Sequence, residues 1–182
     1  MTELFNTPFE TALRVLLLLE SEARTDFSIN MIACVDFAAL YGKSFDISEM
    51  NLHGDNLFKF SEFAALYGRS FAFSGMNLHG DNLFKFSEFA TRKELTRDGM
   101  TLLVRRGFVD VNPTKNGFIY CISARGKEFS RQLDTRYAKE YRGQIRLALQ
   151  HFSNDSEQGI LNKINKLAVA SLEKEEAAFH EE

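Results

Sequence analysis

Residues 91–129 read TRKELTRDGMTLLVRRGFVDVNPTKNGFIYCISARGKEF, and this stretch decides the fold. It predicts a helix over 92–106, with Thr91 as the N-cap and Glu94 completing a capping box. Gly107 then predicts a left-handed helix stop. The alternating residues of 108–111 and the apolar run 118–122 flank a turn at 113–117, so we expect a hairpin. Ser123 is the expected cap of a further helix.

This order of elements is typical of a winged helix-turn-helix domain. Two more helices are expected upstream, one over 8–20 with Thr7 as its cap, and one over 28–41 that Gly42 ends. The sequence therefore predicts a mostly α fold with a small β-hairpin wing. Residues 1–131 would form the winged-helix domain and 132–182 a C-terminal helical extension. Such domains mostly bind DNA or serve as docking blocks in DNA-handling machines, and the fold alone does not decide between them.

The C-terminal region shows helical periodicity. Apolar residues at 129, 133, 137 and 141 predict one helix that continues from Ser123, bends at Gly143 and runs on to Phe152. Residues 153–156 predict a break. We expect the last helix to offer an apolar face to a partner, because the winged-helix core is complete without it. That partner-binding face would consist of Ile160, Ile164, Leu167 and Leu172. The alternative is that it packs within the helical extension itself.

A tandem repeat separates the second helix from the helix over 92–106. Residues 37–62 and 63–88 agree at 22 of 26 positions, and removing the second copy leaves a seamless join from Glu62 to Phe89. Two copies do not make a solenoid. We interpret the repeat as a duplication tolerated in an enlarged loop, since long insertions cost little closure entropy. The alternative is that the doubled element extends a partner-binding surface.

The charge of the chain is unevenly distributed. The net charge is −3, which argues against a free-standing, non-specific DNA binder, yet residues 91–131 carry nine basic and four acidic side chains. The candidate DNA contacts are basic residues of this block: Arg92, Lys93, Arg97, Arg105, Arg106 and Lys115. The alternative is an ordinary solvated face, in which Arg105 and Arg106 complement the helix dipole.

No catalytic, cofactor or metal motif is recognisable. His53 and His79 lie in the repeated NLHGDN turn without a nucleophile nearby, and no phosphate-binding glycine loop occurs. We therefore expect no enzyme activity and no cofactor. Cys34 and Cys121 are expected to be free thiols in a reducing compartment. With neither a signal peptide nor an apolar run long enough to span a bilayer, the expected location is the cytoplasm, away from membranes.

Several motifs together resemble one protein family. They are TPFETALR at 7–14, DF at 36–37, YG at 41–42, RKEL at 92–95, GFV at 107–109, GKEF at 126–129 and the repeated NLHGDN and KFSEFA. This set resembles the middle component of bacterial ABC-three-component systems over roughly residues 5–145. The family pattern has one copy of NLHGDN and KFSEFA, so the duplication is a departure from it.

The resemblance implies a subunit of a larger assembly. These systems resemble Lamassu-type antiphage defence complexes, in which an SMC-like coiled-coil ATPase senses DNA and an effector, such as a nuclease, responds. The small middle component resembles the winged-helix accessory subunits of SMC complexes. It would link ATPase and effector, hold the effector inactive, and meet DNA only through the assembled complex. The alternative is a stand-alone transcription regulator that dimerises through its C-terminal helices and binds a palindromic site.

Overall fold

The computed structural model describes residues 7–21, 24, 27–49, 52 and 88–179, with the backbone alone at 88 and 171–179. In chain order the elements are α1 (Pro8–Glu20), α2 (Ile29–Leu40), the 3-10 helix η1 (Gly42–Phe45), α4 (Glu88–Arg105), β1 (Val109–Thr114), β2 (Gly117–Ile122), α5 (Ala124–Arg131), α6 (Arg136–His151) and α7 (Glu157–Phe179). The described chain is thus mostly helical, with a two-stranded antiparallel hairpin, which confirms the predicted fold class at this level.

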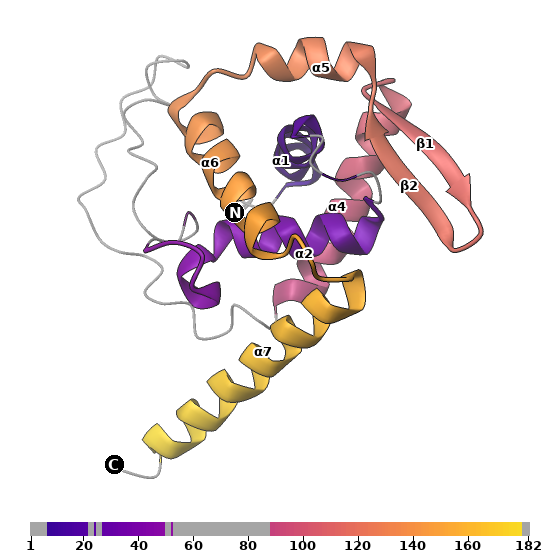
Figure 1. The fold of residues 1–182 in the computed structure, drawn as a ribbon. Helices are drawn as coiled ribbons and strands as arrows, with labels where there is room; N and C mark the ends of the chain where they lie inside the picture. Colours follow the sequence, from indigo (N-terminus) through magenta and orange to yellow (C-terminus); the bar gives the residue numbers. More distant parts are fainter. Residues whose placement is uncertain (1–6, 22–23, 25–26, 50–51, 53–87, 180–182) are drawn as a thin grey trace.

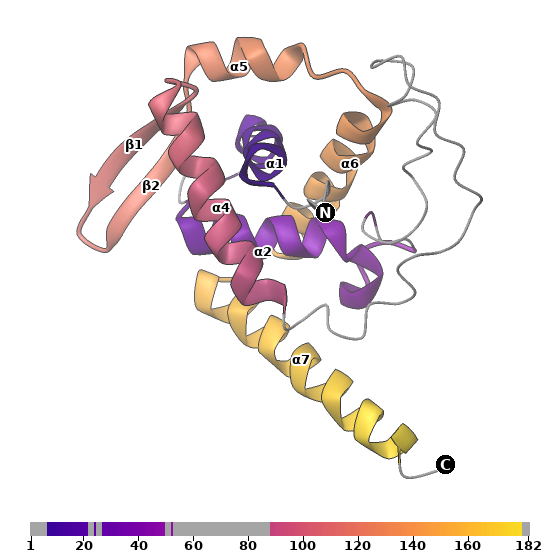
Figure 2. The same cartoon turned by 180° about the vertical axis from the view of Figure 1, so that it is seen from behind.

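Helix α1 is the centre of the molecule. Both views show it in the middle, with α2, α4, α5 and α6 around it (Figures 1 and 2). Every side chain from Arg14 to Leu19 is buried. The predicted cap is confirmed, because the Thr7 hydroxyl accepts a hydrogen bond from the Glu10 amide at 3.2 Å. Helix α4 crosses α1 closely: a Cβ atom on Gly99 would lie 2.9 Å from the Ala12 nitrogen, so this contact requires glycine.

Helix α2 is capped by Ser28 as predicted, and its side chains from Met31 to Leu40 are buried. The predicted end of this helix at Gly42 is confirmed, since α2 ends at Leu40 with Tyr41 as its C-cap. The chain then continues into η1, and Asp46 after it adopts the left-handed conformation, at φ 54°. The Gly42 carbonyl accepts a hydrogen bond from the Ile47 amide at 2.9 Å, which closes this turn.

Helix α4 begins at Glu88, so Thr91 lies inside the helix and the prediction that it is the N-cap is wrong. The added turn is stabilised by packing, since the rings of Phe89 and Phe37 lie 5.2 Å apart. The predicted stop at Gly107 is confirmed, with φ 69°. Two hydrogen bonds typical of a Schellman motif complete it, from the Gly107 amide to Val104 at 3.0 Å and from the Phe108 amide to Leu103 at 2.9 Å.

The hairpin is present, but its turn is tighter than predicted. Strand β1 pairs with β2 from Val109↔Ile122 to Thr114↔Gly117, so the connecting loop is residues 115–116. Pro113 therefore belongs to a strand, which a two-stranded sheet tolerates because each strand has an edge without hydrogen bonds. Gly117, at φ 124°, supplies the backbone conformation that the short loop needs.

The C-terminal helices differ from the single bent helix that the sequence predicts. Helix α5, capped by Ser123 as expected, ends at Arg131. Helix α6 starts afresh, with Thr135 as its cap, and runs through Gly143 to His151. The predicted break at 153–156 is confirmed: the Ser156 hydroxyl accepts a hydrogen bond from the Gly159 amide at 3.2 Å, at the start of α7.

One hydrophobic core connects these elements. It contains residues of α1, α2, α4, α6 and the first half of α7, so it crosses residue 131, where the sequence predicts a domain boundary. The division into two domains stays a prediction. Residues 37–49 of the first repeat copy form the end of α2, η1 and the turn after it. Most of the remaining repeat, including His53 and His79, lies outside the described residues, as does the predicted loop.

Candidate interaction surfaces

The first candidate surface is the outward side of α4. Its inward side is fully used by the fold, because Thr96, Met100 and Leu103 are buried. On the outward side Arg97 is exposed and donates a hydrogen bond to the Glu94 carboxylate at 2.5 Å. Asp98 is exposed beside this pair. The middle of the outward face therefore carries mixed charge rather than a continuous basic stripe.

The remaining positive charge of this surface lies toward the hairpin. Arg105 and Arg106 are exposed at the end of α4, and Lys115 is exposed in the loop of the hairpin. Lys93, in the first half of α4, is half-buried. These four residues and Arg97 are the predicted DNA contacts that have access to solvent.

The prediction that Arg92 contacts DNA is wrong. The sequence predicts that it lies on the DNA-binding face, but its side chain is only 4% exposed. Its guanidinium carbon lies 5.4 Å from the centre of the Tyr41 ring, and its Nη2 donates a hydrogen bond to the Tyr41 hydroxyl at 3.3 Å. Contact between α2 and α4 thus holds Arg92 inside, where it cannot reach a phosphate group.

The hairpin stands at the side of the helical body and is attached at its base (Figure 1). The Tyr120 amide donates a hydrogen bond to the Phe27 carbonyl, at 2.9 Å, in the segment between α1 and α2. The ring of Phe108 stacks on Phe129 of α5, with centroids 4.8 Å apart. Toward the loop, Phe118 is 58% exposed. The outer half of the hairpin is therefore available to a ligand while its base is fixed.

Helix α7 has two halves with different environments. Ile160 and Ile164, predicted to bind a partner, are buried in the chain's own core, with exposures of 0% and 1%. They cover α2, which is apolar almost throughout and needs a neighbour. Glu157 fixes this contact by accepting hydrogen bonds from Ser28 and Asn30 of the α2 start. Both isoleucines are therefore removed from the candidate surface.

The other two predicted partner contacts of α7 fare differently. Leu167 is half-buried and packs against the edge of the core. The side chain of Leu172 lies outside the described residues. Val169, which was not among the predicted partner contacts, is 54% exposed. Beyond it, α7 extends away from the body in both views (Figures 1 and 2). This outer half is the second candidate surface.

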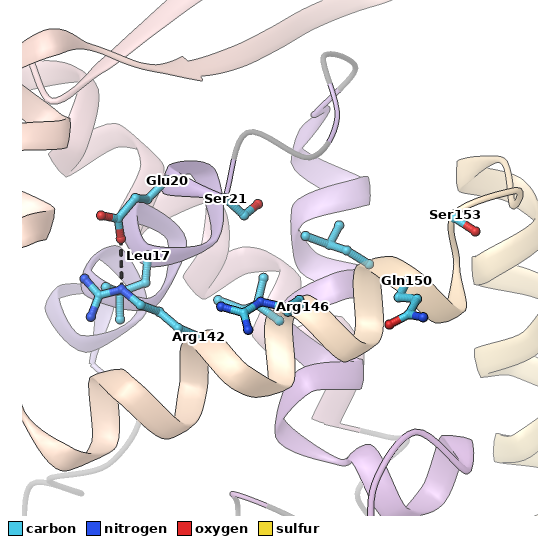
Figure 3. Close-up of a pocket in the computed structure, with 9 residues that line it drawn as sticks. Leu17, Glu20, Ser21, Arg142, Arg146, Gln150 and Ser153 are labelled. Atoms are coloured by element: carbon cyan, nitrogen blue, oxygen red, sulfur yellow. Dashed lines mark hydrogen bonds and ion pairs between the residues drawn. The ribbon is translucent and has the colours of Figure 1, made fainter.

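The third candidate surface is an open cleft of about 600 Å³ between α1 and α6 (Figure 3). Its apolar residues are Leu17, Ile145 and Leu149, and its polar rim consists of Glu20, Ser21, Arg142, Arg146, Gln150 and Ser153. Arg142 is fully engaged, because it donates to Glu20 at 2.9 Å and to the Leu133 and Ser130 carbonyls at 2.8 Å. Arg146, one turn further along α6, is exposed.

The amino-acid sequence alone does not predict this cleft. In the sequence, only the i, i+4 spacing of Arg142 and Arg146 points to it, because this spacing places both residues on one side of a helix. That they face Glu20 and Leu17 across a hollow depends on how α6 packs against α1, and no local pattern encodes this packing.

A buried polar cluster joins α1, α2 and α6 in the interior. The Arg14 Nε donates to Asp36 at 2.9 Å, and the Tyr141 hydroxyl donates to the same carboxylate. Burial raises the pKa of Tyr141, and the adjacent Asp36 charge raises it further. Burial also raises the pKa of Tyr137 to about 12. The cluster satisfies its own charges and serves to fix three helices, with no side chain presented to a ligand.

The described residues contain no cluster of three or more His, Cys, Asp or Glu side chains that could hold a metal ion. Cys34 is buried, which raises the pKa of its thiol to about 12, so it stays protonated and a poor nucleophile. None of the helices in the described segments has the length and apolar character that crossing a membrane requires.

Comparison with known proteins gives one result that covers most of the chain. The family model for the ABC-three component (ABC-3C) system Middle Component 2 matches residues 4–66 and 63–174. The two matched ranges meet at 63–66, where the second repeat copy begins. No curated protein matches, and no solved structure matches.

Proposed function

Because the chain belongs to the family of the ABC-three component (ABC-3C) system Middle Component 2, we propose that it is a non-catalytic accessory subunit of an antiphage or anti-plasmid defence complex of the Lamassu type. In this proposal the subunit bridges an SMC-like coiled-coil ATPase and an effector nuclease. It keeps the effector inactive until DNA is sensed. The family match, which covers most of the chain, is the observation that carries the proposal.

The distribution of exposed side chains supports a subunit role. Buried charged groups such as Arg14 and Asp36 are used to fix helices, and they do not line an open site. Three surfaces with exposed side chains lie at the periphery of the molecule, outside the hydrophobic core. They are the outer hairpin, the outer half of α7 and the α1–α6 cleft. A bridging protein requires several separate surfaces of this kind on one rigid body.

The winged-helix reading of α4 and the hairpin belongs to this proposal. The DNA-facing set is Lys93, Arg97, Arg105, Arg106 and Lys115. Glu94 and Asp98 lie on the same outward side, and like charges near phosphate groups weaken binding. We therefore propose that this surface contributes to DNA binding within the assembled complex, where the ATPase supplies the other contacts.

Assembly is tested by co-expressing the full chain with the products of its neighbouring genes. We expect it to co-purify with a long coiled-coil ATPase and with a second protein as one species in size-exclusion chromatography. Recovery of the chain alone, as a dimer that binds a palindromic DNA site, would contradict the proposal and favour a transcription regulator.

The DNA surface is tested in that complex by changing Arg97, Arg105 and Arg106 to glutamate. DNA binding should weaken, and the salt dependence of binding should decrease by about one unit of slope for each phosphate group that is no longer neutralised. A matched control changes Arg131, Arg136 and Lys139 to glutamate, which are exposed on α5, at the start of α6 and one turn further along. Equal effects from both variants would show that only net charge matters.

A further inference from the structure

Helix α6 contains a glycine that its own fold does not require. Gly143 lies near the middle of this 16-residue helix, where glycine is less favourable than alanine because it loses more backbone entropy on folding. A Cβ atom on Gly143 would meet no atom of the described chain within 4 Å. Of the six glycines in residues 88–179, it alone combines such open space with an ordinary φ. A neighbour that belongs to another molecule would explain why a side chain is absent here.

The contact between α4 and α1 shows what a helical glycine does in this protein. A Cβ atom on Gly99 would lie 2.9 Å from the Ala12 nitrogen, so the absence of a side chain lets the two helices cross at short distance. The distance between packed helices depends on the side chains at their crossing point. Gly143 offers the same kind of notch on α6, and no helix of the described chain fills it.

The residues around this notch share one side of the helix. Arg146, Leu147 and Gln150 follow Gly143 at i+3, i+4 and i+7. Leu147 is 41% exposed, and Arg146 and Gln150 are exposed as well. The buried side chains of α6, such as Tyr141, pack toward α1 and α2 instead. Gly143, Arg146, Leu147 and Gln150 therefore form an outward face of α6 that combines a notch, an apolar side chain and a cation.

The α1–α6 cleft adjoins the outward face of α6. Arg146 and Gln150 belong to both, because they also form part of the rim of the cleft (Figure 3). The floor of the cleft is apolar and consists of Leu17, Ile145 and Leu149. A ligand that lies on the outward face of α6 can therefore place further apolar side chains in the cleft.

Arg146 determines the charge that such a ligand needs. The three other Lys and Arg side chains of α6 each form an ion pair within the chain. Arg146 forms no ion pair with a described residue, so its charge is available to a carboxylate. A nucleic acid suits this site less well, because the floor is apolar and the Glu20 carboxylate on the rim would repel phosphate groups. These features together favour an amphipathic protein helix with an acidic side chain.

We propose that the outward face of α6 and the α1–α6 cleft dock a helix of another subunit of the defence complex. This helix crosses α6 at Gly143, places apolar side chains against Leu147 and in the cleft, and carries an aspartate or glutamate that pairs with Arg146. The inference rests on the proposed function and deepens it, because it gives one of the bridging surfaces a partner of defined chemistry.

The notch is tested by measuring the affinity of the full chain for the ATPase and for the second co-purifying protein, each produced separately. Gly143→Ala should weaken binding to one of these partners, and Gly143→Leu should weaken it by roughly tenfold or more, since a side chain then fills the crossing point. Both variants should melt at or above the wild-type temperature, because alanine and leucine favour a helix more than glycine does. A merely structural role for Gly143 would not combine lost docking with undiminished stability.

The matched control for the notch is Gly159→Ala on α7, where the added carbon has only ordinary contacts. It should leave both affinities unchanged. Equal weakening by Gly143→Ala and Gly159→Ala would overturn the assignment of the crossing point to α6.

The charge is tested with the same two partner proteins. Arg146→Glu should weaken binding to the partner that Gly143→Leu affects, by roughly tenfold at low salt and by less as salt is added. Arg146→Lys keeps the positive charge and should retain most of the affinity. Arg131→Glu, at an exposed residue of α5, is the control and should change nothing. In the wild-type complex, amide hydrogen exchange should slow over residues 143–150.

The outcomes separate this inference from the proposed function. If Gly143→Leu and Arg146→Glu bind both partners as the wild type does, the docking site is overturned and the proposed function stands. A wild-type chain that binds neither partner contradicts both. A wild-type chain that dimerises by itself, with the dimer broken by Gly143→Leu, would overturn the assignment to another subunit in favour of a second copy. Weaker DNA binding by the Arg146→Glu complex, with unchanged partner affinities, would overturn it in favour of DNA.

Discussion

Helices α1 and α7 use their surfaces in opposite ways. From Arg14 to Leu19 every α1 side chain is buried, so neighbouring elements cover this part of the helix on all sides. Helix α7 buries Ile160 and Ile164 but leaves Val169 54% exposed, and its outer half lies beyond the body. A helix enclosed on all sides can only contribute stability. A helix that extends beyond its own core has exposed surface, and we propose that this surface contacts another subunit.

The largest expected effect lies within α7, where a substitution in the buried half should destabilise the protein far more than one in the exposed half. Ile164→Asp places a carboxylate in the core and should lower the free energy of unfolding by several kcal/mol, on the order of 3–5 kcal/mol. Val169→Asp, one and a half turns further along, should change it by less than about 0.5 kcal/mol. Urea unfolding of dilute, monomeric protein measures both. Similar losses from the two variants would mean that the outer half is also core.

The second prediction concerns how closely α1 is enclosed. Gly99→Ala would put a Cβ atom 2.9 Å from the Ala12 nitrogen and 3.0 Å from the Pro8 carbonyl oxygen, both of which are backbone atoms. We expect a loss of about 1–3 kcal/mol from overpacking. Gly143→Ala on α6 is the matched control, because nothing lies within 4 Å of its added carbon. It should gain about 1 kcal/mol from helix propensity, so the two thermal midpoints should move in opposite directions.

The elements that the sequence predicts well are those set by local chemistry. Thr7, Ser28 and Ser123 are caps because a hydroxyl satisfies a nearby backbone amide, whatever lies around it. Gly107 is a stop for an equally local reason. The errors arise where packing decides. Helix α4 gains its first turn because Phe89 packs on Phe37, which is 52 positions earlier in the chain.

The same distinction separates the predicted functional residues that are exposed from those that are buried. Arg97 and Lys115 are exposed as predicted, since nothing in the described fold needs them as core. Arg92 looks equally basic in the sequence, but contact with Tyr41 buries it. Ile160 and Ile164 have the periodicity of a docking face, and α2 takes that face for the chain's own core. Periodicity shows that a helix face is apolar and leaves open which surface covers it.

The third prediction concerns the repeat, whose first copy supplies the end of α2. It compares the stability of two variants that each keep only one copy. Deleting 63–88 keeps Asp46 and Ile47, whereas deleting 37–62 replaces them in sequence with Ala72 and Phe73. Asp46 is left-handed, a conformation that alanine adopts less readily, and Ile47 packs against the core. We expect the first deletion variant to be more stable than the second by about 1–2 kcal/mol in urea unfolding. Equal stability would show that the copies are interchangeable.

The smallest expected effect lies at the start of α1, where its enclosure reaches an ionisable group. The Glu10 carboxylate accepts a hydrogen bond from Arg14 at 3.4 Å, but its other oxygen is buried without a hydrogen-bond partner. Burial raises the pKa of Glu10 and outweighs the opposing attraction of Arg14. The folded state therefore holds this proton more tightly than the unfolded state does. The stability linked to it is present below the ordinary pKa of 4.5 and is lost as pH rises through the folded value.

Glu10→Gln removes that loss, so the variant should be more stable than the wild type at neutral pH. The difference should shrink toward zero as the pH falls below 4.5, where the wild-type carboxyl group is protonated in both states. Glu94→Gln is the control, since its exposed pair with Arg97 contributes little at any pH. Urea unfolding of the three proteins from acidic to neutral pH gives the comparison. A Glu10→Gln variant that is less stable at neutral pH would show that the contact with Arg14 outweighs burial, so that even the end of α1 is electrostatically satisfied.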